Sequence, residues 1–179
     1  MKSHYYCSQC LTKQVIRTCE LATEKRELRE EAVIECMKFL GSFNLKETPS
    51  YFGSQIQKII REITGNSDPY RIYKERSTEF AEKMIEKLSI DSIEKALRAA
   101  LTANSIDYGG DKIIEYKETF EEMMKAEIAV NESEKLFKEI EKAEKIVYFF
   151  DNAGEAVFDK KFIDFFEAEV IAVGKRSPM

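Results

Sequence analysis

The pattern of the chain changes at residue 146, where the sequence reads Ile146-Val-Tyr-Phe-Phe-Asp-Asn-Ala-Gly-Glu155. The first five residues form a continuous run of β-branched and aromatic side chains, which is typical of a buried strand. A helical pattern with Phe158 and Phe162 on its apolar side follows, and Val170-Ile-Ala-Val173 predicts a second strand. The order strand, helix, strand predicts one βαβ unit with parallel strands.

The sequence before this unit has the period of helices. Apolar residues three and four positions apart predict helices over residues 11–22, 28–40, 49–63, 69–88, 93–101, 113–124 and 134–140. Thr48-Pro49 is typical of a helix start, and Asp91 with Glu94 resembles a capping box. We expect an α/β fold that is mostly helical in this chain. A multi-helix domain would span residues 1–144, and residues 145–179 would begin an α/β domain.

Composition excludes several classes of protein. The 179 residues are 44% hydrophobic and 34% charged, which suits a folded domain. A net charge of -5 argues against general binding to nucleic acid. The chain has no apolar run near the roughly 20 residues of a membrane span, and its N-terminus lacks the apolar core of a signal peptide. We therefore expect a cytoplasmic protein without a nucleic-acid or membrane partner.

Two strands are too few for a stable sheet, because three or more are usually needed. We therefore expect a fragment, completed by a second copy or by a missing C-terminal half.

The first candidate site is Asp151-Asn-Ala-Gly-Glu155, at the carboxyl end of the predicted strand, where open α/β sheets bind ligands. Asp151 offers a carboxylate and Asn152 an amide oxygen, and Mg²⁺ or Mn²⁺ prefers such hard ligands. Gly154 lets the backbone approach a phosphate, and the next helix can direct free N–H groups at it. The alternative is a strand-to-helix turn with an ordinary Asx cap.

Two further stretches carry polar or sulfur ligands. Asn104 and Asp107 lie in a glycine-terminated turn after a helix, where the alternative is a simple helix C-cap. His4, Cys7 and Cys10 are spaced by three, with Cys19 further on. This pattern leaves open a zinc site, a redox pair and cysteines that only pack.

Taken together, four segments resemble the damage-control phosphatase family, first catalogued as a domain of unknown function and also described as acidic-residue-methyltransferase-like. The segments are Cys7-Ser-Gln-Cys10-Leu11, Ile63–Tyr70 with Lys74–Ser77, Leu101–Gly109, and Asp151–Glu155 with Phe158-Asp159. The N-terminal C-x2-C resembles the subfamily of archaea and some other prokaryotes.

The resemblance implies a helical N-terminal region packed on a Rossmann-like α/β/α domain. It implies hydrolysis of phosphate monoesters, with sugar phosphates or damaged phosphometabolites as substrates, and a divalent cation such as Mn²⁺, Mg²⁺, Co²⁺ or Ni²⁺. Asp151 and Asn152 match the family's metal ligands. Asn104 and Asp107 would line the substrate pocket with Gly154, and Glu155 would support the ligands.

A further aspartate ligand of the family follows a proline after the second strand. Here the sequence ends at Pro178-Met179, so the resemblance implies an incomplete or inactive enzyme. Two other readings stay open. One is a helical interaction module in which the Asp151-Asn152 turn is structural, and the other is a zinc or redox protein that uses Cys7 and Cys10. A third alternative keeps the phosphatase but makes Asp151 a covalent nucleophile.

Overall fold

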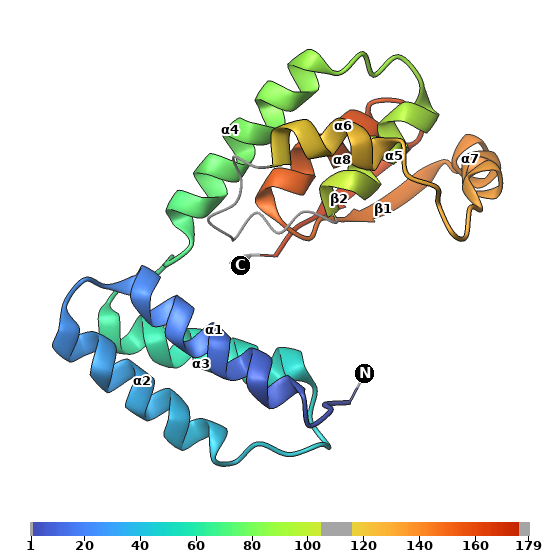
Figure 1. The fold of residues 1–179 in the computed structure, drawn as a ribbon. Helices are drawn as coiled ribbons and strands as arrows, with labels where there is room; N and C mark the ends of the chain where they lie inside the picture. The colour runs from blue at the N-terminus through green and yellow to red at the C-terminus, as the bar shows by residue number, and fades with distance from the viewer. Residues whose placement is uncertain (1, 105–115, 176–179) are drawn as a thin grey trace. The chain divides into compact units, whose positions relative to one another are not determined.

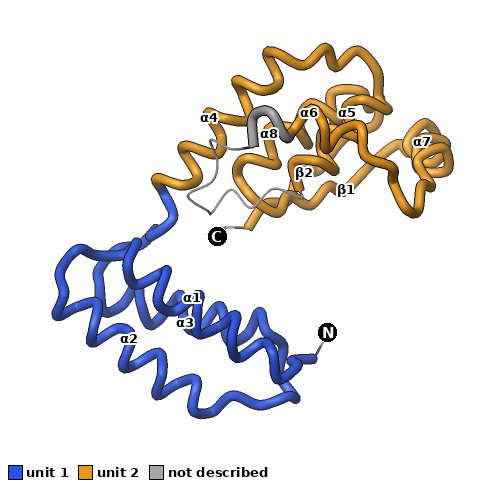
Figure 2. The backbone as a smooth tube through the Cα atoms, viewed as in Figure 1, with its two compact units in different colours: residues 1–71 blue, residues 72–179 orange. Residues whose placement is uncertain are grey.

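A computed structural model describes residues 2–104 and 116–175 of the chain (Figure 1). It divides into two compact units, residues 1–71 and residues 72–179 (Figure 2). This division follows contacts between residues. The boundary at 144/145 expected from the sequence is of another kind, because it separates helical from α/β sequence. That boundary stays a prediction.

The first unit consists of three helices, α1 (Cys7–Ala22), α2 (Arg26–Leu40) and α3 (Pro49–Thr64). They confirm the three predicted helices of this region, although α1 begins four residues earlier because its first turn is largely exposed and carries no apolar period. The helices enclose one apolar core. Its buried members are Leu11, Val15, Cys19, Ala22, Ala32, Cys36, Phe52, Ile56 and Ile60.

The start of α3 follows the Thr48-Pro49 signal, and a glycine ends the helix. The Thr48 side chain accepts a hydrogen bond from the N–H of Tyr51 at 3.2 Å, and Pro49 is the first helical residue. Gly65 ends the helix with a φ of 71°, in the left-handed region that glycine adopts without strain. Its N–H donates to the carbonyl of Arg61 at 3.0 Å.

The second unit is an α/β arrangement dominated by helices, as the sequence predicts. Its elements are α4 (Arg71–Lys87), α5 (Ile93–Asn104), α6 (Tyr116–Met124), α7 (Ser133–Lys142), β1 (Lys145–Phe149), α8 (Ala153–Ile163) and β2 (Glu169–Val173). Strands β1 and β2 are parallel, in a register that runs from Lys145 opposite Glu169 to Phe149 opposite Val173. The predicted βαβ unit is therefore confirmed.

The start of α5 corrects one detail. Ser92, not Asp91, caps the helix, because its hydroxyl accepts from the N–H of Lys95 at 3.3 Å. Asp91 instead pairs with the ammonium group of Lys95. The predicted capping box is thus wrong by one residue.

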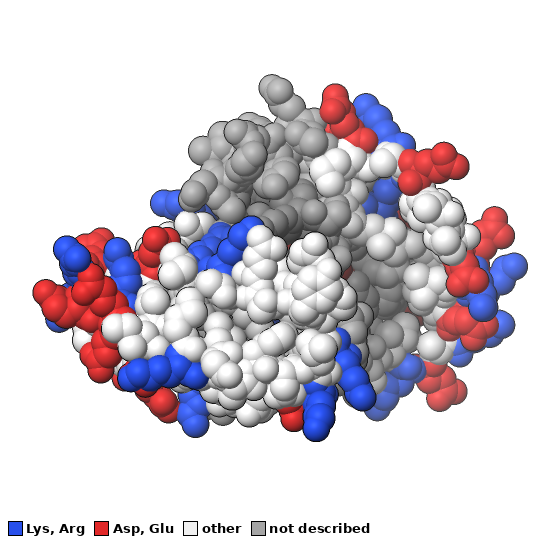
Figure 3. Space-filling model, turned by 60° about the horizontal axis from the view of Figure 1, so that its bottom comes forward, with Lys and Arg blue, Asp and Glu red and all other residues white. Residues whose placement is uncertain are grey.

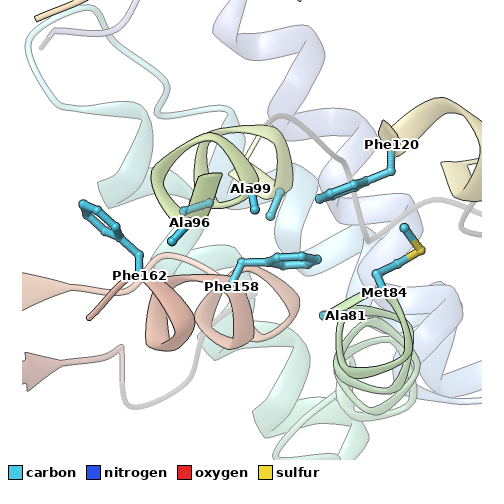
Figure 4. Close-up of a cluster of buried hydrophobic side chains, with 9 residues drawn as sticks. Ala81, Met84, Ala96, Ala99, Phe120, Phe158 and Phe162 are labelled. Atoms are coloured by element: carbon cyan, nitrogen blue, oxygen red, sulfur yellow. The ribbon is translucent and has the colours of Figure 1, made fainter. Parts of the chain in front are cut away.

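Aromatic stacking between α6 and α8 builds the core of the second unit (Figure 4). The rings of Phe120 and Phe158 stack with their centroids 5.0 Å apart. Ala96 and Ala99 of α5 are fully buried beside them, and such small side chains let helices approach closely. This packing sets the end of α5 against the start of α8, the two places where candidate site residues lie.

The prediction that the first strand is buried is wrong for one face of the sheet. Val147 is 51% exposed and Phe149 is 73% exposed, and their neighbours Ile171 and Val173 on β2 are also exposed. Ile146 and Tyr148 point the other way and are half-buried. Among the described residues, the face with Val147 and Phe149 is left largely open to solvent.

Two properties concern the expectations on nucleic-acid binding and membrane insertion. On the face drawn in Figure 3, the coloured basic and acidic side chains are interspersed, and neither sign forms a continuous patch. No helix in the described ranges is long and apolar enough to cross a membrane.

Candidate active site

The turn between β1 and α8 carries Asp151 and Asn152. Asn152 caps α8 with an extended backbone, and its side-chain oxygen accepts from the N–H of Glu155 at 2.9 Å. Its side-chain amide also donates to Oε2 of Glu155 at 2.8 Å. The Asx cap is therefore present. It leaves room for a ligand, because an amide oxygen has two lone pairs and the cap uses one.

Glu155 joins this turn to the end of α5. Asn104, the last residue of α5, donates its side-chain amide to Oε1 of Glu155 at 2.6 Å. Each carboxylate oxygen of Glu155 thus accepts from one asparagine. The Glu155 residue is only 7% exposed. Burial raises the pKa of its carboxyl group, and the hydrogen bond from Asn104 opposes that rise.

Asp151 lies nearer the solvent than the residues around it. Its side chain is 60% exposed and forms an ion pair with the ammonium group of Lys175. Lys175 follows β2, so the pair connects the carboxyl ends of both strands. The sequence patterns considered above do not point to Lys175. The signal that could have found it is a basic residue two positions after a strand that is parallel to the one before Asp151.

One helical turn beyond Glu155, Asp159 is a second residue without a predicted role. It is 3% exposed, and its Oδ1 accepts from the hydroxyl of Tyr148 at 2.8 Å. Its Oδ2 is buried and has no hydrogen-bond partner in the described part of the chain. Burial, helped by the charges of Glu155 and Asp151, raises the pKa of Asp159 to about 6. Burial also raises the pKa of Tyr148.

The structure thus brings Asn104, Asn152 and Glu155 into direct contact, with Asp151 beside them. Gly154 is buried in the first turn of α8. Asp107 lies outside the described residues.

The cysteines belong to the other unit. Cys7 and Cys10 lie in the first turn of α1, and the sulfur of Cys7 accepts from the N–H of His4 at 3.3 Å. Cys19 is buried and lies twelve residues further along the same helix, or about 18 Å. It therefore cannot complete a four-ligand zinc site with Cys7. Within residues 2–104 and 116–175, no three His, Cys, Asp or Glu residues gather as a metal cluster. A metal or redox role for Cys7 and Cys10 stays a prediction.

Comparison with known proteins identifies the family of the chain. The model of the damage-control phosphatase ARMT1-like domain matches residues 3–179. The chain belongs to this family. A crystal structure of a DUF89-family protein from Pyrococcus horikoshii superimposes with a TM-score of 0.84 at 34% identity, over 99% of this chain and 66% of that one.

Two curated relatives carry the name damage-control phosphatase. A damage-control phosphatase of P. horikoshii is 34% identical over 189 residues, covering 100% of this chain and 66% of its own length. A damage-control phosphatase of Archaeoglobus fulgidus is 31% identical over 172 residues, covering 89% of this chain and 58% of its own. The chain therefore spans between 58% and 66% of the length of these two relatives.

The oxygen atoms at the β1–α8 turn of this family member suit a hard divalent cation. Asp151 contributes an exposed carboxylate, and Asn152 contributes an amide oxygen with a spare lone pair. Both are the oxygen ligands that Mg²⁺ or Mn²⁺ prefers. The ion pair with Lys175 shows that Asp151 has room for a cationic partner. The residues present therefore fit the metal that the family resemblance implies.

Proposed function

We propose that this chain carries part of the active site of a metal-dependent phosphatase for phosphate monoesters of small metabolites. The observation that carries the proposal is the carboxylate of Glu155, which binds the amides of Asn104 and Asn152 beside Asp151. A structural turn needs only the cap made by Asn152. It does not need a buried carboxylate that also holds a second amide from another helix.

The residues would divide the work as follows. Asp151 and Asn152 would hold the divalent cation, which when bound polarises a phosphoryl oxygen and lowers the pKa of a water molecule. Glu155 fixes the orientation of the Asn152 amide through two hydrogen bonds, one to the side-chain oxygen and one from the side-chain nitrogen. The carboxylate of Glu155 also accepts a hydrogen bond from the side-chain amide of Asn104. One residue therefore positions two amides.

The substrate phosphate would meet the N-terminus of α8. The first N–H groups of a helix have no acceptor within the helix and favour anions. Lys175 adds a positive charge at the same edge of the sheet. Mn²⁺, Mg²⁺, Co²⁺ and Ni²⁺ all suit the proposal, and a sugar phosphate or a damaged phosphometabolite would be the substrate.

Metal binding by this chain tests the proposal directly. We expect Mn²⁺, followed by its electron paramagnetic resonance signal, to bind at least tenfold more weakly to Asp151→Ala than to the wild type. Asp164→Ala is the matched control, because Asp164 is an acid at the far end of α8 that pairs with Lys160. Equal Mn²⁺ affinity of the wild type and Asp151→Ala would contradict the proposal.

Turnover is the second measurement. We expect the full-length P. horikoshii relative to hydrolyse p-nitrophenyl phosphate with Mn²⁺ or Co²⁺, and to lose that activity when the aspartate that aligns with Asp151 is replaced by alanine. An alanine variant that kept full activity would count against the roles assigned here.

A further inference from the structure

Tyr148 and Asp159 stand on either side of the turn that carries Asp151 and Asn152. Tyr148 belongs to β1 and Asp159 to α8. The hydroxyl of Tyr148 donates to Oδ1 of Asp159 at 2.8 Å, although the two residues lie eleven positions apart in the sequence. This hydrogen bond therefore ties the strand that enters the turn to the helix that leaves it.

The burial of Asp159 costs stability. The residue is 3% exposed, yet only one of its two carboxyl oxygens has a hydrogen-bond partner among the described residues. A buried polar atom without a partner is unfavourable. The carboxylate of Glu155, one helical turn earlier in α8, and that of Asp151, just before the helix, add like charge. Stability of the fold alone does not explain an acid at this position.

We propose that Asp159 is a positioning residue, which acts through the hydroxyl of Tyr148 to fix the turn between β1 and α8 and thereby orients Asp151 and Asn152. The assignment of Asp151 and Asn152 as ligands rests on the proposed function. The hydrogen bond between Tyr148 and Asp159 does not depend on that function. Two backbone hydrogen bonds flank the turn, from the N–H of Phe150 to Val173 and from the N–H of Ala156 to Asn152. The Tyr148 hydroxyl adds the link between side chains of β1 and α8.

Asp159 could also act by charge alone, as a negative group beneath Asp151 and Glu155. The two roles predict different behaviour of Asp159→Asn. Asparagine keeps an oxygen that accepts from Tyr148 but has no charge. If the hydrogen bond fixes the turn, the turn stays ordered in Asp159→Asn and is loosened in Tyr148→Phe. If Asp159 acts by charge alone, Asp159→Asn changes the turn and Tyr148→Phe does not.

Native-state amide hydrogen exchange of the full chain, measured without metal, tests whether the hydrogen bond between Tyr148 and Asp159 fixes the turn. The reporters are the N–H of Phe150, bound to Val173, and the N–H of Glu155, bound to the Asn152 side chain. We expect both to exchange about threefold to tenfold faster in Tyr148→Phe, the range expected for one lost hydrogen bond. In Asp159→Asn, which keeps the acceptor for Tyr148, both should exchange no faster than in the wild type.

Two controls define what would overturn the proposal. Tyr51→Phe removes a hydroxyl from an exposed tyrosine of the other unit and should change neither reporter. The N–H of Asp164, bound to Lys160 at the end of α8, should be unaffected in every variant. Unchanged reporters in Tyr148→Phe, equal acceleration of Asp164, or acceleration in Asp159→Asn would each overturn the positioning role.

Mn²⁺ binding to the same variants separates this inference from the proposed function. We expect Tyr148→Phe to bind Mn²⁺ about threefold to tenfold more weakly than the wild type, and Asp159→Asn to bind it normally. If Mn²⁺ binding depends on Asp151 but not on Tyr148, the inference fails and the function stands. If binding does not depend on Asp151, the function fails and the exchange rates still decide whether Asp159 fixes the turn.

Discussion

The side-chain amide of Asn104 donates to Oε1 of Glu155 at 2.6 Å, although the two residues lie 51 positions apart in the sequence. Asn104 ends α5 and Glu155 lies in the first turn of α8. The other oxygen of Glu155 accepts from Asn152. One buried carboxylate therefore connects a helix end to the turn that carries the candidate metal ligands.

We expect Asn104→Ala to lower the free energy of unfolding by about 1.5–3 kcal/mol, the usual range for a hydrogen bond to a charged group. In a double-mutant cycle measured by urea unfolding, Asn104→Ala and Glu155→Ala should couple by about 1 kcal/mol or more. The exposed pair Lys160 and Asp164 of the same helix is the control, with an expected coupling of about 0.5 kcal/mol or less. Additive effects at Asn104 and Glu155 would contradict the contact.

The sequence predicts the elements of this fold because most of its signals are local. The cap at Thr48 and the elements of the parallel βαβ unit follow from patterns of residues a few positions apart. Exposure of the sheet was not predictable in this way. An apolar run such as 146–150 shows that a strand can be buried, but whether other elements cover both faces is a property of the whole fold.

The candidate site shows the same limit. The position of Asp151 and Asn152 at a strand end can be read from the local pattern. The contact of Asn104 with Glu155, the ion pair of Lys175 and the tie of Tyr148 to Asp159 each depend on tertiary packing. The family resemblance supplied Asn104 and Glu155 as pocket residues. Neither the pattern nor the resemblance assigned a role to Lys175 or Tyr148.

Lys175 should compete with a metal for Asp151. The two side chains form an exposed ion pair, which a divalent cation at Asp151 has to displace. Because exposed pairs are worth about 0–1 kcal/mol, we expect Lys175→Gln to bind Mn²⁺ up to about fivefold more tightly than the wild type. Isothermal titration calorimetry measures the change. Lys160→Gln, which removes an ammonium group paired with Asp164, should leave the affinity unchanged. Weaker binding by Lys175→Gln would show that Lys175 supports the metal site and does not compete with it.

Asp159 should make stability depend on pH in the acid range. Its pKa is raised from the usual 3.8 to about 6 by burial and by the charges of Glu155 and Asp151, while Tyr148 opposes the rise. A raised acid pKa means that the folded chain binds the proton more tightly than the unfolded chain. The resulting stabilisation is complete below pH of about 4 and is lost as the pH rises through about 6.

Asp159→Asn removes this titration. We expect the free energy of unfolding of the variant to rise relative to that of the wild type between pH 4 and 6. At pH 7 the variant should be more stable by at most about 3 kcal/mol. Chemical unfolding of both proteins at a series of pH values gives the difference directly. Asp164→Asn, which removes an exposed carboxyl from the same helix, is the control. A difference between wild type and Asp159→Asn that does not change with pH would mean that Asp159 titrates normally.

The exposed face of the sheet should make this chain self-associate. That face carries Val147, Phe149, Ile171 and Val173. Among the described residues each strand pairs only with the other, which leaves one edge of each strand unpaired. Apolar faces and open edges both promote association. Phe149 is 73% exposed, so Phe149→Lys should leave the fold intact while it disrupts the contact between copies. We expect sedimentation velocity to show association of the wild type that grows with concentration and is reduced in Phe149→Lys. Leu45→Lys is the control, because Leu45 is an exposed apolar residue of the first unit. A wild-type chain that stays monomeric at high concentration would show that this apolar face does not drive self-association.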